Sequence, residues 1–223
     1  VIKGASTKVA IFKLTNSGSV AAKITSLKMK RTGVSSDSTF RNVYLYNGDT
    51  RITDAASVAS GMINFSDATG IVTVPAMSSI TVGVMVEVDG SLSTNNGETI
   101  GVMLTDVTTD GGSVSGLPLS GAPMTVVPAP SGMATVSFNS ANAIPTSSSG
   151  IDPQADYVVW QSTVSVNSRD VLVSSLRFRQ LGSVSAGDLK NFRLMVDGVQ
   201  VGTAVDMVNS NQYVEFTFAS PVT

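Results

Sequence analysis

Cationic side chains alternate with apolar ones in two segments, and they are the residues best placed for binding chemistry. Lys28 and Lys30 are separated by one apolar residue, and so are Arg177 and Arg179. Alternate residues of a strand share a face, so each pair points away from the core. Such a face suits an acidic glycan or a neighbouring protein module. It equally suits a solvated surface whose charges prevent edge pairing and aggregation.

Aromatic and basic residues continue this pattern further along the chain. Tyr44 and Tyr46 show the same spacing on what we expect to be a neighbouring strand, and Arg193 stands in the corresponding segment of the second half. Pointing the same way, they would extend a cation- and tyrosine-lined face. The candidate interaction face therefore comprises Lys28, Lys30, Tyr44, Tyr46, Arg177, Arg179 and Arg193.

Clustered oxygen-bearing side chains leave calcium open as an alternative. One loop holds Asp89, Asn95, Asn96 and Glu98, and a second segment holds Asp106 and Asp110. Hard oxygen ligands are those that Ca²⁺ takes, but the spacing matches no EF-hand loop. Aspartate in such places typically forms turns by bonding to the local backbone. No other metal or cofactor is predicted.

The composition removes several catalytic classes. The 223 residues include no cysteine and no histidine, so thiolate nucleophiles and Ser-His-Asp triads are excluded. Paired carboxylates would suit glycoside hydrolysis, but the acidic residues stand in turn contexts. We therefore expect a protein that is not an enzyme. A net charge of −2 argues against nucleic acid as a partner, and no apolar run approaches a transmembrane segment.

The segments expected to position these residues occur twice in the sequence. Residues 24–46 and 173–195 align without a gap, 149 positions apart. The aligned pairs include Leu27/Leu176, Met29/Phe178, Gly33/Gly182, Asn42/Asn191 and Leu45/Leu194. Each copy then reaches a turn, Asn47-Gly48 in the first and Asp197-Gly198 in the second. A repeat of this length indicates one module used twice.

Runs rich in β-branched residues between Gly, Asn, Asp and Ser clusters predict strands throughout, with no convincing helix. In the first half we expect strands at 8–15, 22–30, 42–46, 62–65, 71–74, 80–88, 98–104 and 124–127. Residues 128–132 carry two prolines and predict a stiff linker. The modules then span 1–127 and 133–223. Trp160 is expected to anchor the core of the second.

Comparing the two halves reveals a mismatch. The second has an opening strand at 134–138 without a counterpart in the first, and the first has strands at 80–88 and 98–104 without counterparts in the second. This comparison matches Phe216 and Phe218 with Val72 and Val74. Either the chain is a window of a longer array, or a neighbouring chain supplies the strands by β-strand addition.

Short motifs along the chain resemble a known family. They are Lys3–Ser6, Phe12–Thr15, Ile24–Leu27, Asn42–Asp49, Ile71–Pro75, Trp160-Gln161, Asp170–Val173 and Val196–Gly202. The series resembles the tandem β-sandwich modules of large secreted, S-layer-like surface proteins of small-celled bacteria. The resemblance implies an all-β chain of two immunoglobulin-like sandwiches in tandem, displayed on the cell surface. The strands that each module lacks at the chain ends are a departure from the family's pattern.

These observations lead to one expected function and two alternatives. We expect a structural subunit or fragment of a self-assembling cell-surface array or filament, whose partners are copies of itself. The first alternative is an adhesin or glycan-binding module that uses the basic face for a cell-surface glycan. The second is an accessory β-domain region of a polysaccharide-degrading enzyme.

Overall fold

The computed structural model describes residues 1–91, 97–139, 152–210 and 212–222. These residues form antiparallel strands and one short 3-10 helix, Asp37–Thr39. The chain divides into two compact units, Val1–Ala129 (unit 1) and Pro130–Thr223 (unit 2). The boundary falls inside the proline-rich segment 128–132. None of the described residues form a helix long and apolar enough to cross a membrane.

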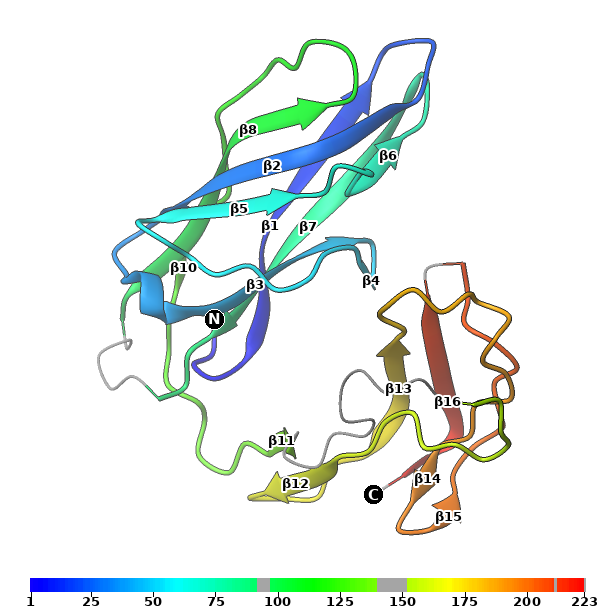
Figure 1. Ribbon diagram of the computed structural model, residues 1–223. Helices are drawn as coiled ribbons and strands as arrows, with labels where there is room; N and C mark the ends of the chain where they lie inside the picture. The colour runs from blue at the N-terminus through cyan, green and yellow to red at the C-terminus, as the bar shows by residue number, and fades with distance from the viewer. Residues whose placement is uncertain (92–96, 140–151, 211, 223) are drawn as a thin grey trace. The chain divides into compact units, whose positions relative to one another are not determined.

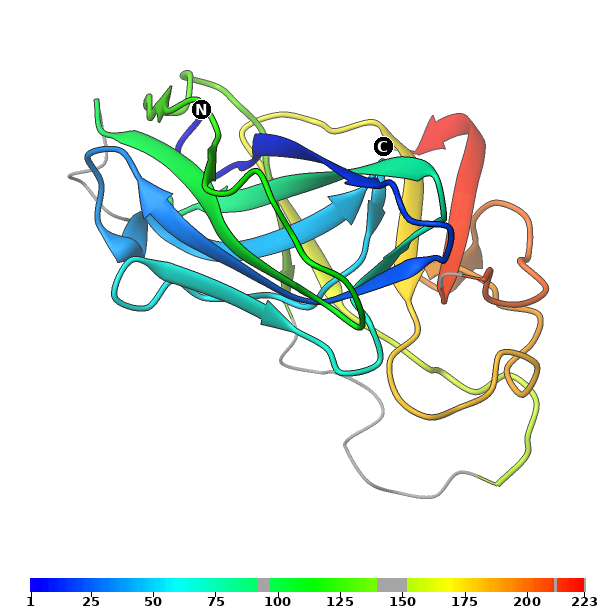
Figure 2. The same cartoon turned by 90° about the horizontal axis from the view of Figure 1, so that it is seen from above.

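Unit 1 is a β-sandwich (Figure 1). Its first sheet contains, in spatial order, β1 (Ser6–Asn16), β7 (Ser78–Val88), β3 (Phe40–Asn47) and β4 (Thr50–Arg51). Its second sheet contains β10 (Met124–Thr125), β8 (Thr99–Thr109), β2 (Ala22–Thr32) and β5 (Met62–Ser66), with β6 (Val72–Val74) also on β2 and β9 (Leu119–Ser120) also on β8. Figure 2 shows β1 and β7 in one layer and β2 and β5 in the other.

Alternation along the strands creates the core between these sheets. Val82, Val84, Val86 and Val88 all point inward from β7 and are buried, as their spacing predicts. Inward residues of the other long strands meet them, among them Phe12, Leu27, Met29, Val43, Leu45, Ile100, Val102 and Leu104. The outer faces of both sheets carry the polar residues.

The first two strands of unit 1 lie in different sheets. In a complete immunoglobulin domain the first strand shares a sheet with the second, and the last shares a sheet with the third, whereas unit 1 is predicted to lack its opening strand. Here β1 lies in the sheet of β3, and β8, the last long strand, pairs with β2. The all-β, double-sheet expectation is confirmed, and the immunoglobulin-like assignment stays a prediction.

Unit 2 contains shorter pieces of the same kind. β11 (Thr135–Asn139) pairs with β12 (Thr163–Asn167), and β13 (Val173–Arg179) pairs with β16 (Tyr213–Val222). A small hairpin joins β14 (Met195–Val196) to β15 (Val199–Gln200). Its buried hydrophobic cluster is small and consists of Val208, Val214, Phe216 and Phe218.

The two units repeat their pairings in register. Tyr46 faces Arg51 across the β3–β4 hairpin, and Met195 faces Gln200 at the matching positions. Val43 and Ala56 exchange two backbone hydrogen bonds, as do Phe192 and Val205, which lie 149 positions later. The Arg31 N–H donates to the Gly61 carbonyl, and the Gln180 N–H donates to the Gln212 carbonyl, both at 2.8 Å.

This register corrects one sequence alignment. Phe65 lies opposite Leu27, and Phe216 lies opposite Leu176. Val72 lies opposite Ile24, and Val222 lies opposite Val173. Phe216 therefore corresponds to Phe65 and not to Val72, because the loop preceding it is longer in unit 2.

Candidate functional site

The two lysines of the predicted face lie on the outer surface of the β8–β2–β5 sheet. Lys28 and Lys30 are exposed, while Leu27 and Met29 between them are buried. The Lys28 Nζ lies 2.9 Å from Oδ2 of Asp106, which faces it across the ladder from β8. Both side chains are about half exposed, so the pair is screened by solvent. This face therefore carries a charge that is partly compensated.

Tyr44 and Tyr46 lie on the opposite side of the sandwich. Their strand, β3, belongs to the β1–β7–β3–β4 sheet, and its inward residues Val43 and Leu45 are fully buried. The prediction that the tyrosines share a face with Lys28 and Lys30 is wrong. After Thr32 the chain crosses through the 3-10 helix to the other sheet, whereas the prediction assumed that consecutive strands pair.

The tyrosines belong instead to a second polar cluster, which we call the Tyr44 face. Glu87 on β7 accepts hydrogen bonds from Nδ2 of Asn42 at 2.6 Å and from the Tyr44 hydroxyl at 3.2 Å. The Arg51 guanidinium carbon lies 4.8 Å from the Tyr44 ring centroid. Burial, and then the Glu87 charge, raise the pKa of Tyr44 above its usual value. The roles of Asn42, Arg51 and Glu87 were not predicted from the sequence.

In unit 2 two of the predicted arginines, Arg177 and Arg193, form ion pairs with acidic neighbours. Arg177 NH2 lies 2.9 Å from Oε1 of Glu215 on β16, and its guanidinium lies over the Tyr213 ring. Arg179 lies on the same side of β13 as Arg177. Arg193, which occupies the position of Tyr44 in the repeat, forms an ion pair with Asp156. Arg193 is thus bound by a separate acidic group and not by the one that holds Arg177.

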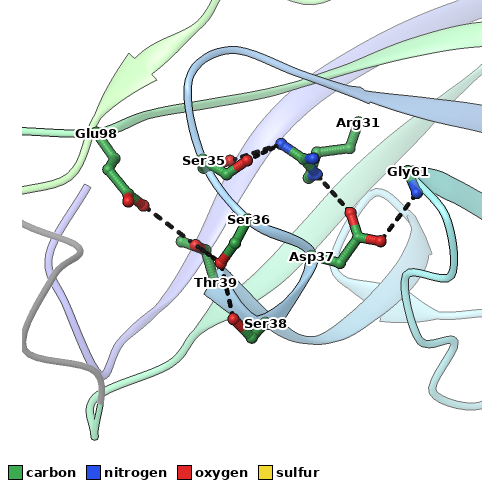
Figure 3. Close-up of polar contacts among 8 residues, drawn as sticks. All are labelled: Arg31, Ser35, Ser36, Asp37, Ser38, Thr39, Gly61 and Glu98. Atoms are coloured by element: carbon green, nitrogen blue, oxygen red, sulfur yellow. Dashed lines mark hydrogen bonds and ion pairs between the residues drawn. The ribbon is translucent and has the colours of Figure 1, made fainter.

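A further polar cluster in unit 1 lies around the crossover from β2 to β3 (Figure 3). Asp37 accepts hydrogen bonds from Nε of Arg31 at 2.8 Å and from the N–H of Gly61 at 2.9 Å. The Gly61 N–H, followed by Arg31, lowers the pKa of Asp37 below its usual value. The buried Thr39 donates its hydroxyl to Glu98 at 3.2 Å. The cluster therefore joins the β2–β3 crossover by hydrogen bonds to the segments that contain Gly61 and Glu98.

Unit 2 keeps only a reduced version of this cluster. Gln180 stands at the position of Arg31 and donates Nε2 to the Val184 carbonyl at 2.6 Å. Arg31 contacts the Ser35 carbonyl at the matching position. Ala186 stands where unit 1 has Asp37. The carboxylate contacts made by Asp37 are therefore specific to unit 1, and they hold the β2–β3 crossover in place.

The described residues that were considered as calcium ligands form hydrogen bonds or ion pairs with other protein groups. Asp89 accepts two hydrogen bonds from Ser91, and Asp110 accepts the N–H of Lys23 at 2.9 Å. Glu98 accepts the Thr39 hydroxyl, and Asp106 pairs with Lys28. Asn95 and Asn96 lie outside the described residues. Within the described part of the chain, no three acidic residues gather as metal ligands would.

Trp160 is less enclosed than the sequence predicts. Its ring lies 6.4 Å from that of Phe138 and 4.9 Å from that of Phe178, between centroids. The side chain nevertheless remains 44% exposed. It therefore packs on the edge of an aromatic row instead of inside a closed core.

Comparison with known proteins adds no assignment, because no family model, no curated protein and no solved structure matches the chain.

Proposed function

We propose that this chain is a non-enzymatic structural protein of the cell exterior, a building block of a self-assembling surface array or filament. The observation that carries the proposal is the repetition of one strand framework in register, from the β3–β4 hairpin to the pairing of β2 with β5. Tandem copies of one framework lengthen a chain and multiply its contact surfaces.

The kind of residue that recurs supports this function. Leu27, Gly33 and Leu45 recur at the equivalent positions as Leu176, Gly182 and Leu194. Several polar groups do not recur, since Arg31 is replaced by Gln180 and Tyr44 by Arg193, although the basic residues Lys28 and Lys30 return as Arg177 and Arg179. Packing and turn residues specify a scaffold, whereas function depends on the chemistry of particular sites. The repetition therefore preserves a scaffold.

Charge reversal on the outer surface of the β8–β2–β5 sheet and of β13 tests the proposal. We expect the full chain to self-associate with rising concentration, and Lys28→Glu with Arg177→Glu to weaken that association at least tenfold. Sedimentation velocity and electron microscopy measure the assembly, and circular dichroism checks the fold. Lys13→Glu with Arg169→Glu, a matched change at other exposed cations, should have a smaller effect. A chain that stays monomeric at every concentration would overturn the proposal.

The Tyr44 face supports glycan binding as a second candidate function. An aromatic ring, a guanidinium, an amide and a carboxylate lie together on one sheet surface. Rings that stack on sugars beside hydrogen-bonding groups would suit a cell-surface glycan. On a glycan array, binding that is lost in Tyr44→Ala and kept in Lys28→Ala would support this function. A blank array would remove it.

A further inference from the structure

We propose that the Tyr44 face binds an acidic glycan, and that a carboxylate of this glycan pairs with Lys8 on the outer surface of the β1–β7–β3–β4 sheet. The inference rests on glycan binding, the second candidate function above, and it names the charge of the ligand and the residue that selects it. Strand β1 brings Lys8 to the same face as Tyr44, because both residues lie opposite Met85 of β7.

The side chain of Lys8 lies across the outer surface of β7. A Cβ built on Gly83 would lie 3.3 Å from Cε of Lys8 and 3.4 Å from its Cδ, so the lysine stem covers this glycine. Tyr46 faces Gly83 from β3, on the far side of β7. The stem therefore runs from β1 toward the two tyrosines, and the ammonium group is held over the middle of the three long strands.

Gly83 makes room for this lysine. Its φ does not lie in the left-handed region, so its backbone conformation does not require glycine. It lies inside β7, the middle long strand, where glycine weakens a strand and commonly marks the close approach of another group. Here the group that approaches is the stem of Lys8. The glycine therefore positions the lysine.

The ammonium group of Lys8 is not neutralised by the protein. Among the described residues, Lys8 forms no hydrogen bond or ion pair through its side chain, whereas Lys28 pairs with Asp106. The four strands of its sheet contain one carboxylate, that of Glu87. Its two oxygens already accept hydrogen bonds from Asn42 and Tyr44. A partly buried cation without a counter-ion attracts an anionic ligand.

The groups around Lys8 match a sugar better than a bare ion. Ile11, which is 63% exposed, and Tyr46 lie opposite the same glycine from β1 and from β3, so apolar surface flanks the ammonium on both sides. Such surface packs against the C–H faces of sugar rings, while oxygens of Asn42 and Glu87 keep lone pairs that accept sugar hydroxyls. One ammonium matches the single charge of a carboxylate. The ligand that these groups fit is a glycan containing uronic acids.

Binding of uronate trimers to the full 223-residue chain tests the proposal. The probes are trimers of galacturonate, mannuronate and guluronate, each compared with its methyl ester, which keeps the sugar and loses the charge. In isothermal titration calorimetry we expect an acid trimer to bind at least tenfold more tightly than its ester, and this preference to shrink as salt rises. Equal affinity for acid and ester would overturn the inference and leave glycan binding in place. Binding of no trimer would also overturn it.

A lysine substitution locates the charge that selects the acid. Lys8→Met removes the ammonium and keeps a stem of similar length over Gly83, so the fold should persist. We expect the affinity for the acid trimer to fall at least tenfold, to that of the ester. Lys23→Met removes an equal charge from an exposed position of β2, in the other sheet, and should leave the preference unchanged. Equal losses in the two variants would assign the effect to net charge and overturn the site.

A glycine substitution separates binding from stability. In Gly83→Ala the new Cβ lies 3.3 Å from Cε of Lys8, so the flexible stem must move. Alanine suits the middle of a strand better than glycine, so the melting temperature should stay the same or rise while the preference for the acid trimer falls about tenfold. A stable Gly83→Ala chain with an unchanged preference would overturn the proposed placement of Lys8.

The assembly function is tested separately, by sedimentation velocity of the same chain without glycan. A chain that stays monomeric and binds acid trimers through Lys8 would sustain this inference while removing the proposed assembly function. A chain that assembles and binds no trimer would sustain the assembly function while overturning this inference.

Discussion

Units 1 and 2 share a framework but differ in how far their cores are closed. In unit 1 two sheets enclose one large cluster, in which many side chains have no exposed surface. In unit 2 the equivalent β13–β16 pair carries a small cluster, and many large apolar residues remain exposed. The comparison teaches that local pairing can recur faithfully without the strands that close the sandwich. Closure depends on β7 and β8.

The largest difference between the units should come from one leucine in each copy. Leu27 is 1% exposed, whereas Leu176 is only partly buried. We expect Leu27→Ala to lower the free energy of unfolding of unit 1 by about 2–5 kcal/mol, and Leu176→Ala to cost unit 2 about half as much. Urea denaturation followed by hydrogen exchange in β2 and in β13 measures both. Equal costs would show that unit 2 is as well packed as unit 1.

A glycine substitution should separate backbone strain from crowding. Gly33 and Gly182 have φ of 90° and 101°, so alanine at either position is strained by roughly 1–2 kcal/mol. Only Gly33→Ala also meets the Thr99 carbonyl. We expect Gly33→Ala to be clearly the more destabilising in thermal unfolding. If Gly182→Ala proved equally costly, crowding by β8 would be irrelevant.

Acid should affect unit 1 through Asp37. Because the folded pKa of Asp37 is lowered from 3.8, its contribution to stability is present above that value and is lost as the pH falls through the folded pKa. We expect Asp37→Asn to lower stability at neutral pH and to flatten the acid dependence of unit 1. Hydrogen exchange between pH 5 and pH 2.5 tests this, with amides of unit 2 as the internal control. A slope unchanged by the substitution would contradict it.

Surface ion pairs should give the smallest difference. Lys28–Asp106 and Arg177–Glu215 are both 2.9 Å long and substantially exposed. We expect Lys28→Ala and Arg177→Ala each to cost about 0.2–1 kcal/mol, and less at high salt because ions screen exposed pairs. Denaturation midpoints at low and high salt measure the effect. A cost above that range for Arg177→Ala alone would indicate that packing on Tyr213 matters more than charge.

Prediction from sequence succeeded where the signal was local. The strands expected in the first half coincide closely with β1, β2, β3, β5, β6, β7 and β8. The hairpins after β3 and β14 fall where the turn residues place them. The candidate face failed as a unit, because it joined Lys28 to Tyr44 across two sheets.

The sequence by itself determined that this protein is all-β, that one framework occurs twice, and which side of each strand faces the core. A period of two residues is a property of the strand alone, so it can be seen without knowing any partner. Only the tertiary structure decided which strands share a sheet, and therefore that Tyr44 lies with Glu87 and Arg51 and not with Lys28. Sheet membership depends on pairings between distant segments, such as β3 with β7 and β2 with β8, which alternation alone does not encode.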